Sequence, residues 1–141
     1  MKQRVPRRAW RSARRPGHRP RVLIEDGRPA LAISDFSLFE QAGFDVAFCP
    51  GPGRVACPLP GGRPCPIVAG ADAVLHGLDP GLGVAAAIRR HRPGLPVVVA
   101  QRRRADGSLP PVPPGCTPHV FPSSVQGQIG ALWRALLSRP A

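Results

Sequence analysis

The sequence predicts an α/β fold built on a parallel sheet. The main evidence is the stretch 21–46, RVLIEDGRPALAISDFSLFEQAGFDV, in which a short apolar strand, a helix and a second short strand follow one another. Strand, helix and strand in close order make a βαβ unit, whose two strands run parallel. The run Leu95–Ala100, LPVVVA, is typical of a further buried strand. A length of 141 residues suits one domain of ordinary size.

The first βαβ unit is bounded by residues that suit its ends. Its opening strand, Val22–Ile24, is followed by two acids, Glu25 and Asp26. Pro29 falls in the first turn of the helix, where proline is best tolerated, and Gly43 falls at its C-terminal cap. The two acids should therefore lie at the carboxyl end of the strand, where open α/β sheets place their sites.

The helix that follows needs an apolar face toward the sheet. At helical spacing one face collects Leu31, Leu38, Phe39 and Ala42. Ile33 and Phe36 fall outside this face, and we expect both to be exposed.

This opening stretch resembles that of response-regulator receiver domains, the phospho-acceptor modules of two-component signalling. Those domains begin with an apolar strand, an acid pair, a proline-started helix ending in Ala-Gly-aromatic, and a second strand. Here the acid pair, Pro29 and Ala42-Gly43-Phe44 have the same order and spacing. The resemblance implies a flavodoxin-like receiver fold, with five parallel strands in the order 2-1-3-4-5.

The segment Cys49–Gly70 departs from the receiver pattern. Receivers place their second helix here, but proline or glycine occupies half of these positions, so we expect a loop with no helix of useful length. Three cysteines occur at equal intervals, and a proline follows each: Cys49, Cys57 and Cys65. Three thiols in such a loop could hold zinc or an iron–sulfur cluster, although the Cys-x-x-Cys spacing of common zinc sites is missing.

A fourth ligand for such a metal is hard to find. Cys116 should lie at the opposite end of the sheet, and His76 about two strand spacings, roughly 10 Å, from Cys49. A disulfide is another interpretation, although cytosolic chains rarely keep one. The simplest interpretation is that the thiols pack against apolar neighbours.

The third predicted strand, Ala71–Leu78, lacks the residue on which receiver chemistry depends. In receivers this strand ends in the aspartate that takes the phosphoryl group, and that position here falls on Gly77. Glycine has no carboxylate, so no acyl phosphate can form there. Asp79 lies two residues further on.

The second half of the chain also matches receivers in its predicted helix and strands but differs from them at the functional positions. A helix is predicted over 82–92 and a strand over 95–100, after which receivers carry Thr or Ser where this chain has Gln101. Residues 105–118 hold five prolines, so the family's fourth helix should also be a loop. The conserved lysine position before a proline is occupied by Phe121, at the end of a short last strand over 119–121.

The last predicted helix spans 124–138. Its apolar stripe comprises Val125, Ile129, Leu132 and Leu136. Ser123 and Gln126 have the spacing of a capping box at its start.

Charge sets the N-terminus apart. The formal net charge is +12, and residues 1–21 contain nine basic residues and no acid. We interpret residues 1–20 as a disordered basic arm whose only large apolar side chain is Trp10, and 21–139 as the receiver-like domain. Removing the arm should leave thermal stability nearly unchanged. It is either a solvated tail or a contact for nucleic-acid phosphates or anionic lipid.

The sequence therefore predicts a degenerate receiver-like signalling module that acts on an unidentified partner protein without Asp phosphorylation. Its degenerate acidic pocket would comprise Glu25, Asp26, Gly77, Gln101, Arg102 and Phe121. Within it we expect Arg102 to form an ion pair with the acids, since no lysine is available. No cofactor is needed for this function.

Two alternatives remain. One is a metal- or redox-binding domain that uses the Cys-Pro loop 49–66, and the other is nucleic-acid binding through the arm and Arg102–Arg104. The histidines are scattered and form no nucleophile set, so we do not expect an enzyme. Because no apolar run approaches 18 residues and no secretory signal follows the basic start, we expect a cytoplasmic protein without a membrane span.

Overall fold

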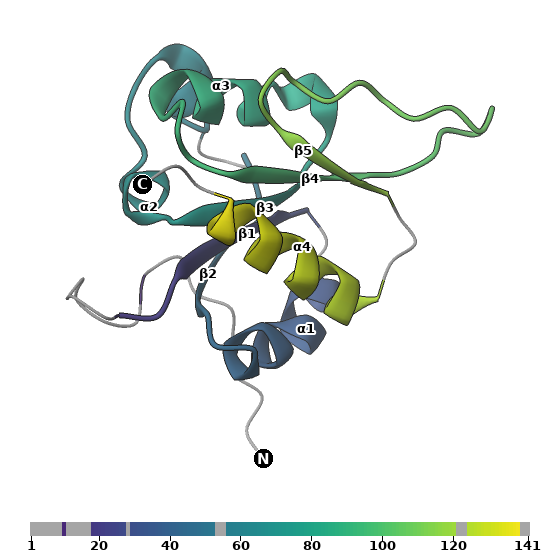
Figure 1. Cartoon of the computed structure of the whole chain (residues 1–141). Coiled ribbons are helices and arrows are strands. Elements are labelled where there is room, and N and C mark those ends of the chain that lie inside the picture. The colour runs from purple at the N-terminus through teal and green to yellow at the C-terminus, as the bar shows by residue number, and fades with distance from the viewer. Residues whose placement is uncertain (1–9, 11–17, 28, 53–55, 121–123, 139–141) are drawn as a thin grey trace.

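A five-stranded parallel sheet crosses the middle of the molecule (Figure 1). The computed structural model describes residues 10, 18–27, 29–52, 56–120 and 124–138, without the side chains of residues 29–34. The strands are β1 (Arg21–Asp26), β2 (Asp45–Cys49), β3 (Ala73–Gly77), β4 (Val97–Gln101) and β5 (Thr117–Val120). Their spatial order is β2-β1-β3-β4-β5, which confirms the predicted sheet.

Helices cover both faces of this sheet (Figure 1). The longer pair, α1 (Pro29–Gln41) and α4 (Val125–Leu137), packs on one face, and α2 (Pro66–Gly70) and α3 (Val84–His91) pack on the other. Two 3₁₀ turns, η1 (Leu59–Gly61) and η2 (Pro80–Leu82), complete the order. Within the described residues no helix is both long and apolar enough to cross a membrane.

The strands direct alternate side chains into two apolar clusters. Val22 and Ile24 of β1 pack with the residues of α1 and α4, whereas Leu23 between them packs with those of α3. The layered core is the expected solution for a sheet whose two faces are both covered.

The buried face of α1 differs from the predicted one. Phe36 was expected to be exposed but is only 1% exposed, and Leu38 was expected to be buried but is 38% exposed. The helix lies against both the sheet and α4, so its two phenylalanines, Phe36 and Phe39, enter the core together. Aromatic rings bury more apolar area than leucine, which favours this orientation. Leu31 and Ile33 lie outside the residues whose side chains are described.

The sequence predicted a loop for the proline-rich segment after β2, but part of this segment is helical. It contains η1 and the five-residue helix α2, which begins with Pro66 at a position where proline is tolerated. Residues 102–116, where the fourth receiver helix would be, contain no helix.

The N-cap of the last helix lies one residue later than the capping box predicted. Ser124, rather than Ser123, is the N-cap, and its Oγ accepts a hydrogen bond from the Gly127 N–H at 3.0 Å. Ser123 lies outside the described residues. Further along α4, the Trp133 ring stacks on Phe44 with ring centroids 4.7 Å apart.

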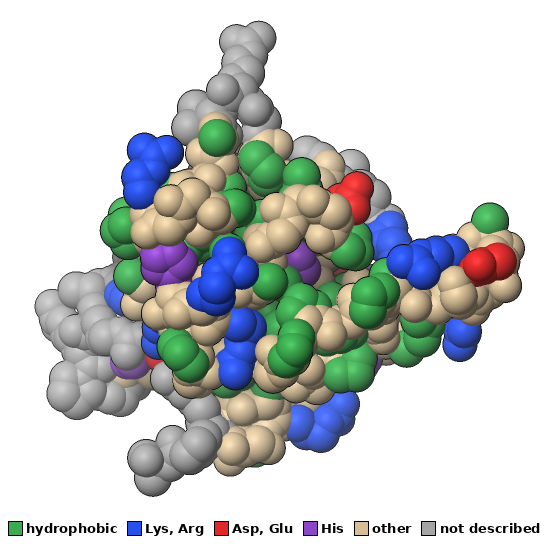
Figure 2. All heavy atoms as spheres, turned by 90° about the horizontal axis from the view of Figure 1, so that it is seen from above, with side chains coloured by type: hydrophobic (Ala, Val, Ile, Leu, Met, Phe, Trp, Pro, Cys, Tyr) green, Lys and Arg blue, Asp and Glu red, His purple; other side chains and the backbone are tan. Residues whose placement is uncertain are grey.

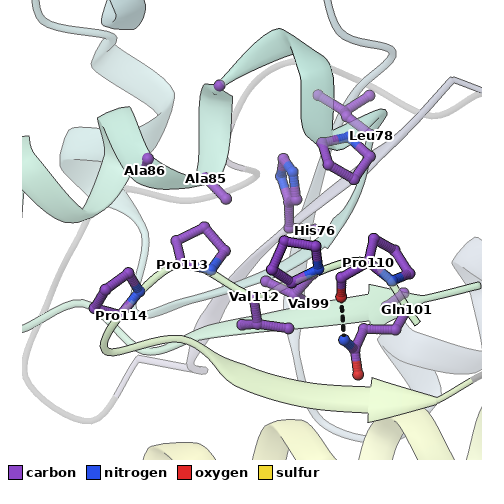
Figure 3. A pocket seen from close by; sticks show the side chains of 14 residues that line it. His76, Leu78, Ala85, Ala86, Val99, Gln101, Pro110, Val112, Pro113 and Pro114 are labelled. Carbon is purple, nitrogen blue, oxygen red and sulfur yellow. Dashed lines mark hydrogen bonds between the residues drawn. The ribbon is translucent and has the colours of Figure 1, made fainter. Parts of the chain in front are cut away.

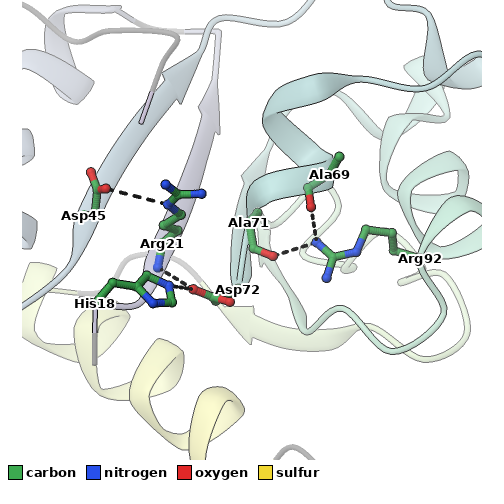
Figure 4. Close-up of polar contacts among 7 residues, drawn as sticks. All are labelled: His18, Arg21, Asp45, Ala69, Ala71, Asp72 and Arg92. Carbon is green, nitrogen blue, oxygen red and sulfur yellow. Dashed lines mark hydrogen bonds and ion pairs between the residues drawn. The ribbon is translucent and has the colours of Figure 1, made fainter. Parts of the chain in front are cut away.

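The described part of the N-terminal segment is attached to the amino ends of the strands (Figure 4). Asp72 accepts hydrogen bonds from the Arg21 backbone N–H at 2.9 Å and bonds His18 Nε2 at 3.2 Å. Trp10 packs against the cluster beneath α3, with the Arg21 guanidinium 5.6 Å from its ring centroid. The expectation that this segment has almost nothing to bury is therefore wrong at Trp10.

Candidate functional site

The carboxyl ends of the strands gather most of the residues that the sequence singled out. In the strand register Glu25 lies between Cys49 of β2 and His76 of β3, and Asp26 lies opposite Gly77. Gln101 ends the next strand, and Arg102 follows it. Phe121, the remaining member of the predicted acidic pocket, lies outside the described residues.

Glu25 is paired with a histidine rather than with an arginine. His76 Nδ1 lies 2.7 Å from Glu25 Oε1, and both residues are buried, at 2% and 3% exposure. Sequence reasoning missed this pair because it treated His76 as a lone histidine. Both residues stand next to last in strands that become neighbours in the sheet, and that position was the available clue.

Asp26 lies near the predicted arginine. Arg102 Nη2 is 4.0 Å from Asp26 Oδ2, at the outer limit for an ion pair, and the arginine side chain is 43% exposed. The predicted pairing is therefore present for Asp26 and absent for Glu25. A surface pair of this kind contributes little to stability. Both residues line a cavity of about 570 Å³ at this edge, with Gly77 and Asp79.

Gly77 gives this cavity no side chain at the strand position opposite Asp26. A Cβ atom built there would lie 3.1 Å from the Glu25 carbonyl oxygen and 3.5 Å from Asp26 Oδ2. The nearby Asp79 is occupied in a turn, where its Oδ1 accepts from the Gly81 N–H at 2.9 Å and caps η2. The position opposite Asp26 therefore offers no oxygen for phosphorylation.

The Gln101 side chain bonds the proline-rich segment that follows β4 and makes no bond to the acids. Its Nε2 donates to the Pro110 carbonyl at 2.6 Å (Figure 3). The neighbouring Arg103 donates to the Gly107 carbonyl at 3.1 Å within the same projecting segment. Figure 2 shows blue Lys and Arg side chains on one face of the molecule interspersed with hydrophobic and other side chains.

The three evenly spaced cysteines meet around one cavity of about 170 Å³, which Glu25 also lines. Burial raises the pKa of the Cys57 thiol, and the nearby Glu25, Cys65 and Cys49 raise it further. The described residues contain no group of three ligands that could hold a metal ion. They contain no disulfide among the four cysteines either. All three thiols pack against the apolar cluster beneath α3.

No family model and no curated protein matches this sequence. Solved structures do match it. A response-regulator receiver protein from Sinorhizobium medicae WSM419 is 20% identical, with a TM-score of 0.58 over 86% of this chain and 98% of that one. The chemotaxis protein CheY4 of Vibrio cholerae is 16% identical, with a TM-score of 0.58 over 84% of this chain and 99% of that one.

The chain therefore has the fold of response-regulator receiver domains. A putative pilus assembly protein from Burkholderia thailandensis E264 is similar to the same degree, at 17% identity and a TM-score of 0.57, covering 84% of this chain and 97% of that one. Identities this low establish the fold alone, and one fold can serve several functions. The function must be argued from the site.

Proposed function

We propose that this protein is a receiver-like signalling module that binds a partner protein and accepts no phosphoryl group. The single observation that carries the proposal is Gly77, which occupies the strand position opposite Asp26 where receivers place their acceptor aspartate. An acyl phosphate needs a carboxylate oxygen as nucleophile. Glycine cannot supply one.

The other residues around Gly77 support the same proposal. In a working receiver the acid pair helps to hold a divalent metal, with the acceptor aspartate as a further ligand. Here Glu25 is bonded to His76, which leaves Asp26 as the carboxylate beside Gly77. Gln101 replaces the hydroxyl residue, and its amide is bonded to Pro110. Mg²⁺ binds through carboxylates and prefers near-ideal octahedral geometry, so this set should bind it weakly.

We propose partner binding because the chain keeps the receiver fold although Gly77 cannot accept a phosphoryl group. Large hydrophobic side chains are exposed on the elements that end the chain, with Val120 of β5 at 39% and Leu137 of α4 at 81%. These elements contribute to the face through which receivers signal, so we assign the partner contact to this side. Isolated exposed hydrophobic residues are ordinary, so their effect must be measured.

The test measures affinity for a partner captured by cross-linking in the native cells. We expect the dissociation constant to be unchanged by a small-molecule phosphodonor, and to rise at least fivefold in Val120→Ser/Leu137→Ser. The matched control, Leu82→Ser on the exposed turn η2, should bind as the parent does. A phosphodonor-dependent affinity that Asp79→Asn abolishes would overturn the proposal.

A further inference from the structure

A third cavity, next to the one beside Asp26, lies between α3 and the segment Pro110–Pro114 (Figure 3). Its volume is about 350 Å³, within the range of about 300–1,000 Å³ of small-molecule sites. In receivers this face of the sheet is covered by their fourth helix. Here an extended proline segment takes the place of that helix, and small residues of α3, Ala85 and Ala86, face it.

The proline segment is bonded to the end of β4 at one end and closes a local turn at the other. At one end Gln101 Nε2 donates to the Pro110 carbonyl at 2.6 Å, and at the other the Cys116 N–H donates to the Pro113 carbonyl at 3.1 Å. Proline fixes its own φ angle, so this wall loses little conformational entropy when a ligand binds. The cavity is therefore largely formed before binding.

Two polar side chains of the sheet line this mostly apolar space, Gln101, whose amide is bonded to Pro110, and His76. Figure 3 shows the His76 ring standing between the proline segment and Leu78. Its Nδ1 is bonded to Glu25, and no group in the described part of the chain bonds Nε2. Nε2 is therefore the ring atom that a bound molecule could hydrogen-bond, as donor or as acceptor. His76 itself is 98% buried, since its exposure is 2%.

The walls select against charged molecules. Among the described residues that line the cavity there is no Lys, Arg, Asp or Glu. A charged head group would lose its water there without gaining an opposite charge, which is unfavourable. The hydroxyl of an uncharged molecule can instead hydrogen-bond Nε2 while the apolar part of that molecule contacts the prolines, Val99 and Val112.

We propose that this cavity binds a small, uncharged, apolar molecule with one hydroxyl group, a phenol or a short alcohol, whose hydroxyl hydrogen-bonds His76 Nε2. The site does not rest on the proposed loss of phosphorylation: it shares Leu78, Pro80, Ala100 and Pro110 with the cavity beside Asp26, but neither Asp26 nor Gly77 lines it. Glu25 acts as a positioning residue that holds the orientation of the histidine ring through Nδ1.

The test titrates the ¹⁵N-labelled full chain with phenol, toluene and benzoate and follows the backbone amides of Ala85, Ala86 and Val99. We expect saturable shifts with phenol and at least tenfold weaker binding of toluene and of benzoate. Ala86→Leu should fill the cavity and abolish phenol binding while leaving the Glu25–His76 pair intact. The control Ala69→Leu, on the exposed side of α2, should bind phenol as the parent does.

Three outcomes would overturn the site. The first is no saturable phenol binding by the folded parent chain. The second is equal phenol affinity in the parent and Ala86→Leu, which would place the phenol elsewhere. The third is equal affinity for toluene and phenol, which would remove the role of His76.

Discussion

His76 Nδ1 lies 2.7 Å from Glu25 Oε1, in a pair that joins two neighbouring strands and is almost entirely buried. In the receiver pattern Glu25 belongs to the acid pair that helps to hold a metal. Here His76 bonds one of the two carboxylate oxygens of Glu25. The pair also separates two cavities, since Glu25 lines the one with the cysteines and His76 lines the one beneath the prolines.

The first prediction concerns the energy of this pair. Glu25→Leu and His76→Leu should each lower the free energy of unfolding by about 1–3 kcal/mol, because each leaves a buried polar partner unsatisfied. The double variant should lose less than the sum of the two, with a coupling of about 0.5–3 kcal/mol. Urea denaturation of all four proteins gives this cycle. Strictly additive losses would mean that the hydrogen bond contributes nothing specific.

The second prediction restores the missing carboxylate. Gly77→Asp should destabilise the fold without metal, because its Cβ meets the Glu25 carbonyl oxygen at 3.1 Å and its charge adjoins Asp26. Mg²⁺ should recover part of that loss, since two carboxylates then face one cation. Thermal melting with and without Mg²⁺ measures this. Gly77→Asn, similar in shape but uncharged, is the control. If both variants respond alike to Mg²⁺, the acids do not form a latent metal site.

The third prediction concerns Trp10. Trp10→Ala should lower the free energy of unfolding by about 1 kcal/mol, roughly half of what full burial of a large apolar side chain contributes. Trp10→Phe should cost less, because the indole N–H is buried and meets no acceptor among the described residues. Leu137→Ala, at a position 81% exposed, is the control for thermal melting. Equal melting of parent and Trp10→Ala would mean that the segment does not support the fold.

The fourth prediction is a pH dependence. Burial raises the pKa of the Cys57 thiol, so the folded state favours the neutral form more than the unfolded state does. Stability from this group is complete below the ordinary thiol range and is lost as pH rises through the raised pKa. Urea denaturation from neutral to alkaline pH should show a steeper fall for the parent than for Cys57→Ala. Parallel curves would contradict the burial of this thiol.

Local pattern was enough for the five strands and for the longer helices. The acid pair, Gly77 and Gln101 each lie at the end of a strand whose residues mark it clearly, so their shared edge follows from parallel topology. The pairing of Glu25 with His76 could not be read in the same way. It depends on which strands become neighbours and in which register, and those are tertiary properties.

Packing between distant segments explains the other differences. The stripe of α1 was chosen by spacing alone, whereas α4 packs against the same helix and draws Phe36 inward. Trp10 is far in sequence from the residues it contacts, such as Arg21 and the cluster under α3. Propensity within a short window does not contain either contact.

The central claim is that this receiver fold accepts no phosphoryl group. The most direct measurement is the intact mass of the full chain after incubation with acetyl phosphate and Mg²⁺, beside a phosphorylatable receiver as a positive control. We predict an unchanged mass, because Gly77 offers no carboxylate and Asp79 caps a turn. A gain of one phosphoryl group that hydroxylamine removes, and that Asp79→Asn or Asp26→Asn prevents, would contradict the account.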